Sequence, residues 1–176
     1  MRIFILALIL ASYSAVGAAQ VPGGTNTSQK IPRSWFLKAR GHEKALALQK
    51  EIGADIFVVF TREAPPGEKG LCQWFETKGL GSSAVRDYLR DYIKVSVPLP
   101  SNPDCQKMAE DFEVRKCPAV FIVQPNGMKF YCKVFDYPDG HPKMFPPETL
   151  IELFRARSSE RYQAPAGTGS DQPTPE

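Results

Sequence analysis

The chain has 176 residues, of which 22 are Lys or Arg, 19 are Asp or Glu and four are Cys, and its formal net charge is +3. A charge this small and this dispersed excludes a nucleic-acid-binding surface, which needs a basic face or stripe. Once an N-terminal segment is set aside, about 155 residues remain, and that length predicts one domain.

The first nineteen residues have the pattern of a secretory signal peptide. Arg2 supplies a positive charge, residues 3–10 are apolar, and small residues at 16–19 provide a cleavage site. The apolar stretch is shorter than the roughly 20 residues that cross a bilayer, so we expect no stable membrane span after cleavage. Cleavage also removes Arg2, which lowers the net charge from +3 to +2. The sequence therefore predicts a periplasmic or secreted protein, in a compartment where cysteine pairs persist.

Two segments have too little apolar surface to fold. Residues 20–33 and 159–176 are rich in Gly, Ser, Thr and Pro, a composition typical of flexible or disordered chain. We therefore predict a flexible linker over 20–33, a folded domain over 34–158 and a disordered tail over 159–176.

Helical and strand patterns alternate along the predicted domain. Helices are indicated by apolar residues at helical spacing, by Gly53 as a C-terminal cap and by Asn102-Pro103 as a helix start. Strands are indicated by short β-branched and aromatic runs, the last two joined by the tight turn Pro125-Asn126-Gly127. The expected order is helix 42–53, strand 56–60, a helix beginning at Cys72, a helix through Tyr92 capped by Ser82 or Ser83, strand 93–99, helix 103–112, strands 119–124 and 129–135, and helix 147–154. This order predicts an α/β fold with parallel pairing and an antiparallel hairpin at one edge.

A Cys-Pro dipeptide and a distant cysteine are the most informative residues. Cys117-Pro118 opens the apolar run 119–123, and Cys72 stands near a helix that follows the first strand. Segments flanking both cysteines resemble the thioredoxin superfamily, and most closely its exported bacterial branch. The matching segments are Trp35, Ala45-Leu46-Ala47, Phe57 to Thr61, Cys72-Gln73-Trp74-Phe75-Glu76, Phe112-Glu113-Val114, Cys117-Pro118 and Pro125-Asn126-Gly127.

The resemblance implies a fold and a site. The implied fold is a three-layer α/β sandwich, with a mixed central sheet, a C-terminal antiparallel hairpin and flanking helices. Pro118 is implied to follow a cis peptide bond and to lie beside the cysteine of the site. Lys69, Trp74 and Phe75 are implied to shape that site.

The redox motif of this superfamily, C-x-x-C, is degenerate here. Lys69 and Phe75 occupy the positions three residues before and after Cys72. In one register Cys72 matches the second, resolving cysteine, and Lys69 replaces the attacking one. In the other register Cys72 is the attacking cysteine of a Cys-Gln-Trp-Phe site. A helix N-terminus and Lys69 are expected to lower the pKa of Cys72, whereas the alternative interpretation is that Cys72 simply packs among Leu71, Trp74 and Phe75.

The remaining cysteines and the histidines suggest no metal centre and no cofactor. Four cysteines allow three complete pairings, and a Cys72–Cys117 bridge across the site is one geometric possibility. Cys105 and Cys132 are expected to be buried or partly buried thiols rather than ligands. His42 is expected on the surface and His141 in a turn, and the aromatic cluster of Trp74, Phe75, Tyr88 and Tyr92 is expected in the core unless Trp74 is exposed beside the site. The spacing of Cys and His residues fits no zinc motif.

Two functions are favoured by the sequence. A third, in which the fold is purely structural and the disordered ends are the functional parts, has little support because the tails carry no recognisable motif. The first is a protein- or peptide-binding, redox-associated module that does not turn over disulfides, because the backbone beside a cis-proline can pair with an extended peptide without any thiol. The second is an enzyme, a one-cysteine thiol-disulfide exchanger that uses Cys72 with Cys117 as the resolving thiol. The partner is expected to be a polypeptide in either case, and the sequence does not predict the oligomeric state.

Overall fold

A five-stranded sheet forms the middle layer of the computed structural model, which describes residues 31–162. The strand order is β1-β3-β2-β4-β5. β1 and β2 run parallel to β3, β4 runs antiparallel to β2, and β5 runs antiparallel to β4. The strands are β1 (Phe36–Leu37), β2 (Ile56–Arg62), β3 (Ile93–Leu99), β4 (Ala119–Val123) and β5 (Lys129–Cys132).

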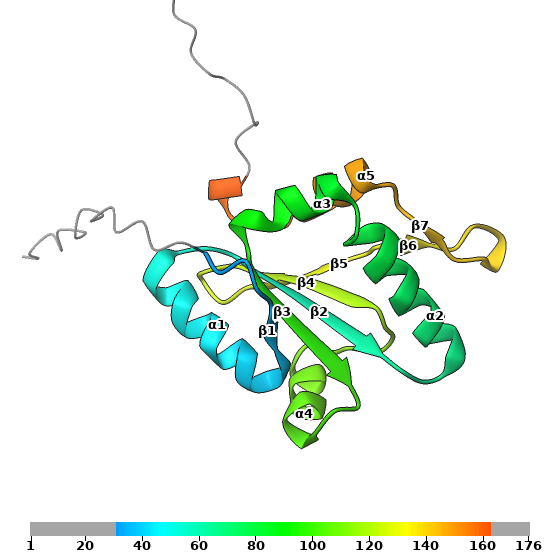
Figure 1. Ribbon diagram of the computed structural model, residues 1–176, viewed down its shortest axis with the longest axis horizontal. Coiled ribbons are helices and arrows are strands. Elements are labelled where there is room, and N and C mark those ends of the chain that lie inside the picture. The colour runs from blue at the N-terminus through cyan, green and yellow to red at the C-terminus, as the bar shows by residue number, and fades with distance from the viewer. Residues whose placement is uncertain (1–30, 163–176) are drawn as a thin grey trace, which may run out of the picture.

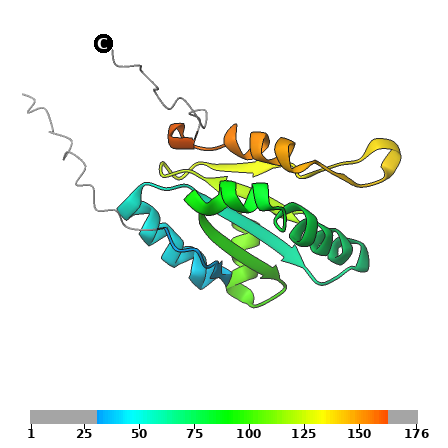
Figure 2. The ribbon, with the colours of Figure 1, turned by 45° about the horizontal axis from the view of Figure 1, so that its top comes forward.

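Helices cover both faces of this sheet. α1 (Lys38–Ile52) and α4 (Pro103–Asp111) pack on one face, and α3 (Ser83–Tyr88) and α5 (Pro147–Arg155) pack on the other. α2 (Pro66–Trp74) follows the carboxyl end of β2 and continues into the π-helix η1 (Phe75–Gly79). Figure 1 shows α1 and α4 apart from α3 and α5, and Figure 2 shows α5 and α1 on opposite sides of the strands. The predicted α/β class, with a mixed sheet and a C-terminal hairpin, is confirmed.

Alternation along the strands creates two apolar layers. Val58 and Phe60 of β2 face the layer that holds α1 and α4, whereas Phe57 and Val59 face the layer that holds α3 and α5. Successive strand residues point to opposite faces of a sheet, so a continuous apolar run such as residues 56–60 is compatible with burial on both faces. All five of these residues are at most 2% exposed.

Several element boundaries differ from the predicted ones. α1 begins at Lys38 rather than near His42, and its predicted cap Gly53 is confirmed, with φ of 64° and its N–H donating to the Gln49 carbonyl at 2.8 Å. α2 begins at Pro66 rather than at Cys72, because proline needs no N–H partner at the first helical position. The helix predicted through Tyr92 has its N-cap at Ser82, one of the two expected caps, and is divided into α3 and the 3-10 turn η2 (Leu89–Asp91).

The C-terminal strand region is also more complex than predicted. β5 ends at Cys132, and a separate antiparallel ribbon of β6 (Phe135–Asp136) and β7 (Lys143–Met144) follows, with the turn η3 (Pro138–Gly140) between its strands. β4 pairs antiparallel with β2, so the parallel pairing expected from strand–helix alternation holds only for the β1, β2 and β3 part of the sheet.

The folded part extends past Ser158, the predicted end of the domain. The backbone N–H and the hydroxyl of Ser159 both donate to the Asp55 carboxylate at 2.7 Å. The turn η4 (Glu160–Tyr162) places the Tyr162 ring on Tyr92, with 4.3 Å between ring centroids. Within residues 31–162 no helix has the length and apolar character to cross a membrane. The predicted signal peptide at 1–19 lies outside the described residues.

Candidate functional site

The loop between α4 and β4 carries Cys117 and Pro118. Their peptide bond is cis, as are the Ala64–Pro65 and Leu99–Pro100 bonds. Cys117 is 2% exposed. Because Ala119 pairs with Phe60 across β2 and β4, the loop lies beside the carboxyl end of β2, where α2 begins.

Cys72 lies in the second half of α2, with its side chain directed into the core. It is 3% exposed and belongs to the same apolar cluster as Cys117. The backbone N–H of Arg62, at the end of β2, donates to the Cys72 sulfur at 3.3 Å. Both cysteines are free thiols, so the possible Cys72–Cys117 bridge is not formed in this structure. The expectation that Cys72 begins the helix is wrong, since α2 starts at Pro66.

Glu68 connects the helix to the cis-proline loop. Its Oε2 atom accepts the backbone N–H of Cys117 at 3.0 Å and lies 3.3 Å from the Arg62 Nη1 atom. Glu68 precedes Cys72 by four residues, so both lie on the same face of α2. The sequence analysis did not identify Glu68 or Arg62 as site residues. The four-residue spacing between Glu68 and Cys72 could have indicated that Glu68 lies near the cysteine. The backbone N–H beside the cis-proline is thus already bonded within the chain.

The environment of the two cysteines favours the protonated thiol. Burial raises the pKa of Cys72, and burial raises that of Cys117 to about 12. The expected lowering of the Cys72 pKa by Lys69 and a helix N-terminus is therefore wrong in direction. Lys69 instead pairs with Glu63 at 3.0 Å. Since the thiolate is the reactive form of cysteine, both thiols are poor nucleophiles at neutral pH.

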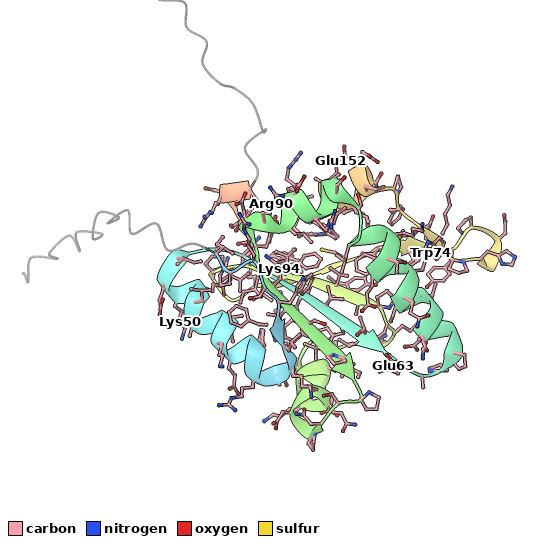
Figure 3. The ribbon with its side chains drawn as sticks, in the orientation of Figure 1. Lys50, Glu63, Trp74, Arg90, Lys94 and Glu152 are labelled. Carbon is pink, nitrogen blue, oxygen red and sulfur yellow. The ribbon has the colours of Figure 1, made fainter. Side chains whose placement is uncertain are left out.

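The predicted aromatic cluster is divided between core and surface. Phe75 and Tyr92 are fully buried, and Tyr88 bonds to Tyr92 through the two hydroxyls at 2.8 Å. Trp74 is 39% exposed, and its ring packs against Phe135 of β6 at 5.4 Å between centroids. Figure 3 shows Trp74 on the side of α2 that faces the β6–β7 ribbon. Trp74 is therefore a surface residue supported by β6, whereas Phe75 holds α2 to the core.

A groove of about 450 Å³ lies next to the cis-proline loop, on the α4 side of the sheet. Its lining combines apolar and charged side chains from the end of α4, the loop, β4 and β5. It contains Phe112, Glu113, Val114, Arg115, Lys116, Ala119, Phe121 and Tyr131. Tyr131 is 53% exposed and packs edge-on against Phe121 at 5.5 Å. β5 is the last strand of the five-stranded sheet, so one of its edges has no strand neighbour in the described part of the chain.

The other two cysteines are buried, and the two histidines differ in exposure. Cys105, in the first turn of α4, and Cys132, at the end of β5, are buried as predicted. His42 is not the surface residue expected, because its ring packs on Phe112 at 5.5 Å and its Nε2 atom is buried without a hydrogen-bond partner. His141 is exposed after the turn η3. Residues 31–162 contain no cluster of His, Cys, Asp and Glu suited to a metal ion.

The chain is similar in structure to thioredoxin-fold proteins. It superposes on the oxidised C-terminal domain of DsbD from Neisseria meningitidis with a TM-score of 0.51 and 15% identity, covering 70% of this chain and 99% of that one. It superposes on DsbH oxidoreductase with a TM-score of 0.52 and 16% identity, covering 76% of this chain and 93% of that one. No protein-family model matches the chain, and no curated protein matches its sequence. The architecture is therefore thioredoxin-like, as the sequence resemblance implied.

Proposed function

We propose that this chain is an exported thioredoxin-fold module that binds an extended polypeptide and does not turn over disulfides. The observation that carries the proposal is the closed state of the cis-proline site. Glu68 occupies the Cys117 N–H, and Cys72 and Cys117 are both buried with raised pKa values. Thiol exchange needs an accessible thiolate, so this arrangement disfavours turnover of disulfides and leaves binding as the better supported function.

The groove beside the loop supports binding of a polypeptide. An extended peptide can add to the open edge of β5 through main-chain hydrogen bonds, which is a common mode of peptide recognition. Tyr131 stands on that strand at the mouth of the groove, and exposed tyrosines are frequent anchors of protein interfaces. In this mode the Glu68–Cys117 hydrogen bond is kept, because the peptide pairs with β5 rather than with the loop.

The charge of the groove favours an acidic segment. Arg115 and Lys116 line it together with a single carboxylate, that of Glu113. Lys129 adds a further cation nearby, since its ammonium lies 4.4 Å from the centroid of the Phe112 ring. A peptide with apolar and acidic side chains complements this surface better than a basic one.

Carboxymethylated insulin B chain, an unfolded polypeptide with added carboxylates, provides a direct binding test. We expect Tyr131→Glu to weaken its affinity, measured by fluorescence anisotropy, by roughly tenfold or more, since each tenfold corresponds to about 1.4 kcal/mol. Met128→Glu is the matched control, because Met128 is 50% exposed on the same hairpin and outside the groove. Equal affinities of the two variants would contradict binding at β5.

Reduction of intact insulin tests the absence of turnover. We expect the protein to leave the rate set by dithiothreitol unchanged. Turnover that Cys72→Ser abolishes and Cys132→Ser retains would overturn the proposal in favour of a one-cysteine exchanger. The export proposal is tested separately, by the N-terminal sequence of the mature protein, which we expect to begin at Ala19 or Gln20.

A further inference from the structure

A second cavity, of about 730 Å³, lies on the opposite face of the sheet from the groove. Its walls come from the β1 edge, from β2 and β3, from the π-helix η1 and from the α3–η2 segment. Trp35, Val59, Leu80 and Leu89 provide apolar surface. This volume is in the range of sites that enclose a small organic molecule. π-helices are rare and frequently occur at functional sites, and η1 places Glu76 in the lining.

The charged groups of the lining are predominantly cationic. Arg33, Arg86, Arg90 and Lys94 face two acids, Glu76 and Asp87. Asp87 pairs with Arg90 at 2.8 Å. Burial, and then the charge of Glu63, raise the pKa of Glu76, which disfavours its anionic form.

Lys94 is the most deeply placed of these cations. Lys94 is 7% exposed. Its ammonium donates to the backbone carbonyls of Pro32, Leu89 and Tyr92 at 3.3, 3.5 and 3.2 Å. These acceptors are neutral. Burial lowers the pKa of Lys94, and the negative charge of Asp91 partly opposes that lowering. Figure 3 shows Lys94 and Arg90 near the junction of the α3 segment with β3.

Arg33 and Arg86 complete the cationic side of the cavity. Both are exposed, and neither has a carboxylate partner among residues 31–162. Guanidinium groups bind carboxylates through paired hydrogen bonds. The cavity thus joins an apolar wall to two available guanidinium groups and one buried ammonium.

We propose that this cavity binds an amphipathic monocarboxylate, with its apolar body against Trp35, Leu80 and Leu89 and its carboxylate held by Arg33 and Arg86. The ligand class follows from the combination of apolar wall and cationic rim. The site is separate from the β5 groove, so this proposal does not depend on the proposed polypeptide binding.

Trp35 provides the readout for a binding experiment. The chain has two tryptophans, Trp35 and Trp74, so Trp74→Phe leaves Trp35 as the single reporter. Dodecanoate, added to this variant of the full chain below its micelle concentration, is expected to change the Trp35 fluorescence saturably. Dodecyltrimethylammonium, with the same chain and the opposite charge, is expected to bind at least tenfold more weakly. No saturable change with dodecanoate, or equal binding of the two probes, would overturn the proposal.

Charge variants test which residues hold the carboxylate. In the same background, Arg33→Gln combined with Arg86→Gln is expected to weaken dodecanoate binding roughly tenfold or more, because charge-assisted hydrogen bonds are lost. The matched control is Arg40→Gln combined with Lys50→Gln, two exposed cations on α1. An equal loss of affinity in the control would indicate a general charge effect and would overturn the assignment.

Discussion

Glu68 holds two distant parts of the chain together through one oxygen atom. Its Oε2 is bonded both to Arg62 at the end of β2 and to the Cys117 N–H of the cis-proline loop. A buried or half-buried N–H that loses its acceptor costs about 1–3 kcal/mol, more than most surface ion pairs contribute. The contribution of Glu68 therefore comes mainly from satisfying Cys117 and less from the ion pair.

We predict that Glu68→Ala lowers the free energy of unfolding by about 1–3 kcal/mol and speeds the reaction of Cys72 and Cys117 with a thiol reagent such as DTNB. Glu68→Gln keeps an acceptor for the N–H and should show a smaller effect on both measurements. Glu63→Ala is the control, because the Glu63 side chain is 79% exposed and contributes at most about 1 kcal/mol. If Glu68→Ala and Glu63→Ala behave alike in urea unfolding, this role of Glu68 is wrong.

His42 makes stability depend on pH. Burial, and then the charge of Lys129, lower the pKa of His42 from 6.5 to about 4 in the folded protein. Between these values the unfolded chain binds the proton more readily, so stability is full above about pH 6.5 and falls as the pH decreases toward 4. We predict a loss of roughly 2 kcal/mol from this residue, after allowance for its partial exposure.

The measurement is urea unfolding at pH 7 and pH 4.5 for the wild type and for His42→Phe. Phenylalanine keeps an aromatic ring against Phe112 and cannot titrate, so the difference between the two pH values should shrink. Other titrating groups, including Asp55 and Glu76, are common to both proteins and cancel in the comparison. An unchanged pH difference in His42→Phe would show that His42 is not responsible.

At the scale of elements, the segment from α2 through η1 to α3 positions Cys72 and forms one wall of the 730 Å³ cavity. Its π-helical turn is closed by the Leu80 N–H, which donates to the Phe75 carbonyl at 2.9 Å. Two glycines allow close packing at this turn, because a side chain at either position would be too close to neighbouring atoms. A Cβ atom at Gly79 would lie 2.7 Å from the Phe75 ring, and one at Gly81 would collide with the Thr77 carbonyl oxygen.

We predict opposite effects of two Gly→Ala substitutions in this segment. Gly81→Ala should destabilise the protein by about 2 kcal/mol or more, because the clash is with backbone and cannot be relieved by a side-chain rotation. Gly70→Ala should stabilise it by roughly 0.5–1 kcal/mol, because Gly70 lies in α2 with no atom within 4 Å of the added Cβ. Thermal unfolding of the two variants checks the sign, and a destabilised Gly70→Ala would contradict the helical conformation of Gly70 within α2.

At the scale of the whole molecule, the segment after α5 returns to the sheet. Asp55, immediately before β2, is fully buried, and its carboxylate accepts both bonds from Ser159. Tyr162 adds a hydrogen bond from its hydroxyl to the Asp91 carbonyl at 2.6 Å. The C-terminal end of the described chain is thus held against the start of β2 and the end of η2.

We predict that a chain ending at Ser158 is less stable than one ending at Tyr162 by about 2 kcal/mol or more. Ser159 supplies hydrogen bonds to a charged group, each worth about 1.5–3 kcal/mol, and their loss leaves the Asp55 carboxyl buried without these donors. Urea unfolding of the two truncated chains measures the difference. Equal midpoints and slopes would show that the segment 159–162 adds nothing to the fold.

Local patterns in the sequence were sufficient for the α/β class, the Gly53 cap, the Asn102 helix start and the hairpin at 125–127, because each depends on residues close together in the chain. Only the tertiary structure decided which distant residues are hydrogen-bonded to one another and whether the cysteines are buried. Glu68 and Cys117 are 49 residues apart, and Asp55 and Ser159 are 104 apart, so no local pattern indicates that they meet. The sequence predicted a lowered pKa for Cys72 because of a helix N-terminus and Lys69. Burial instead raises this pKa, and burial depends on the tertiary structure.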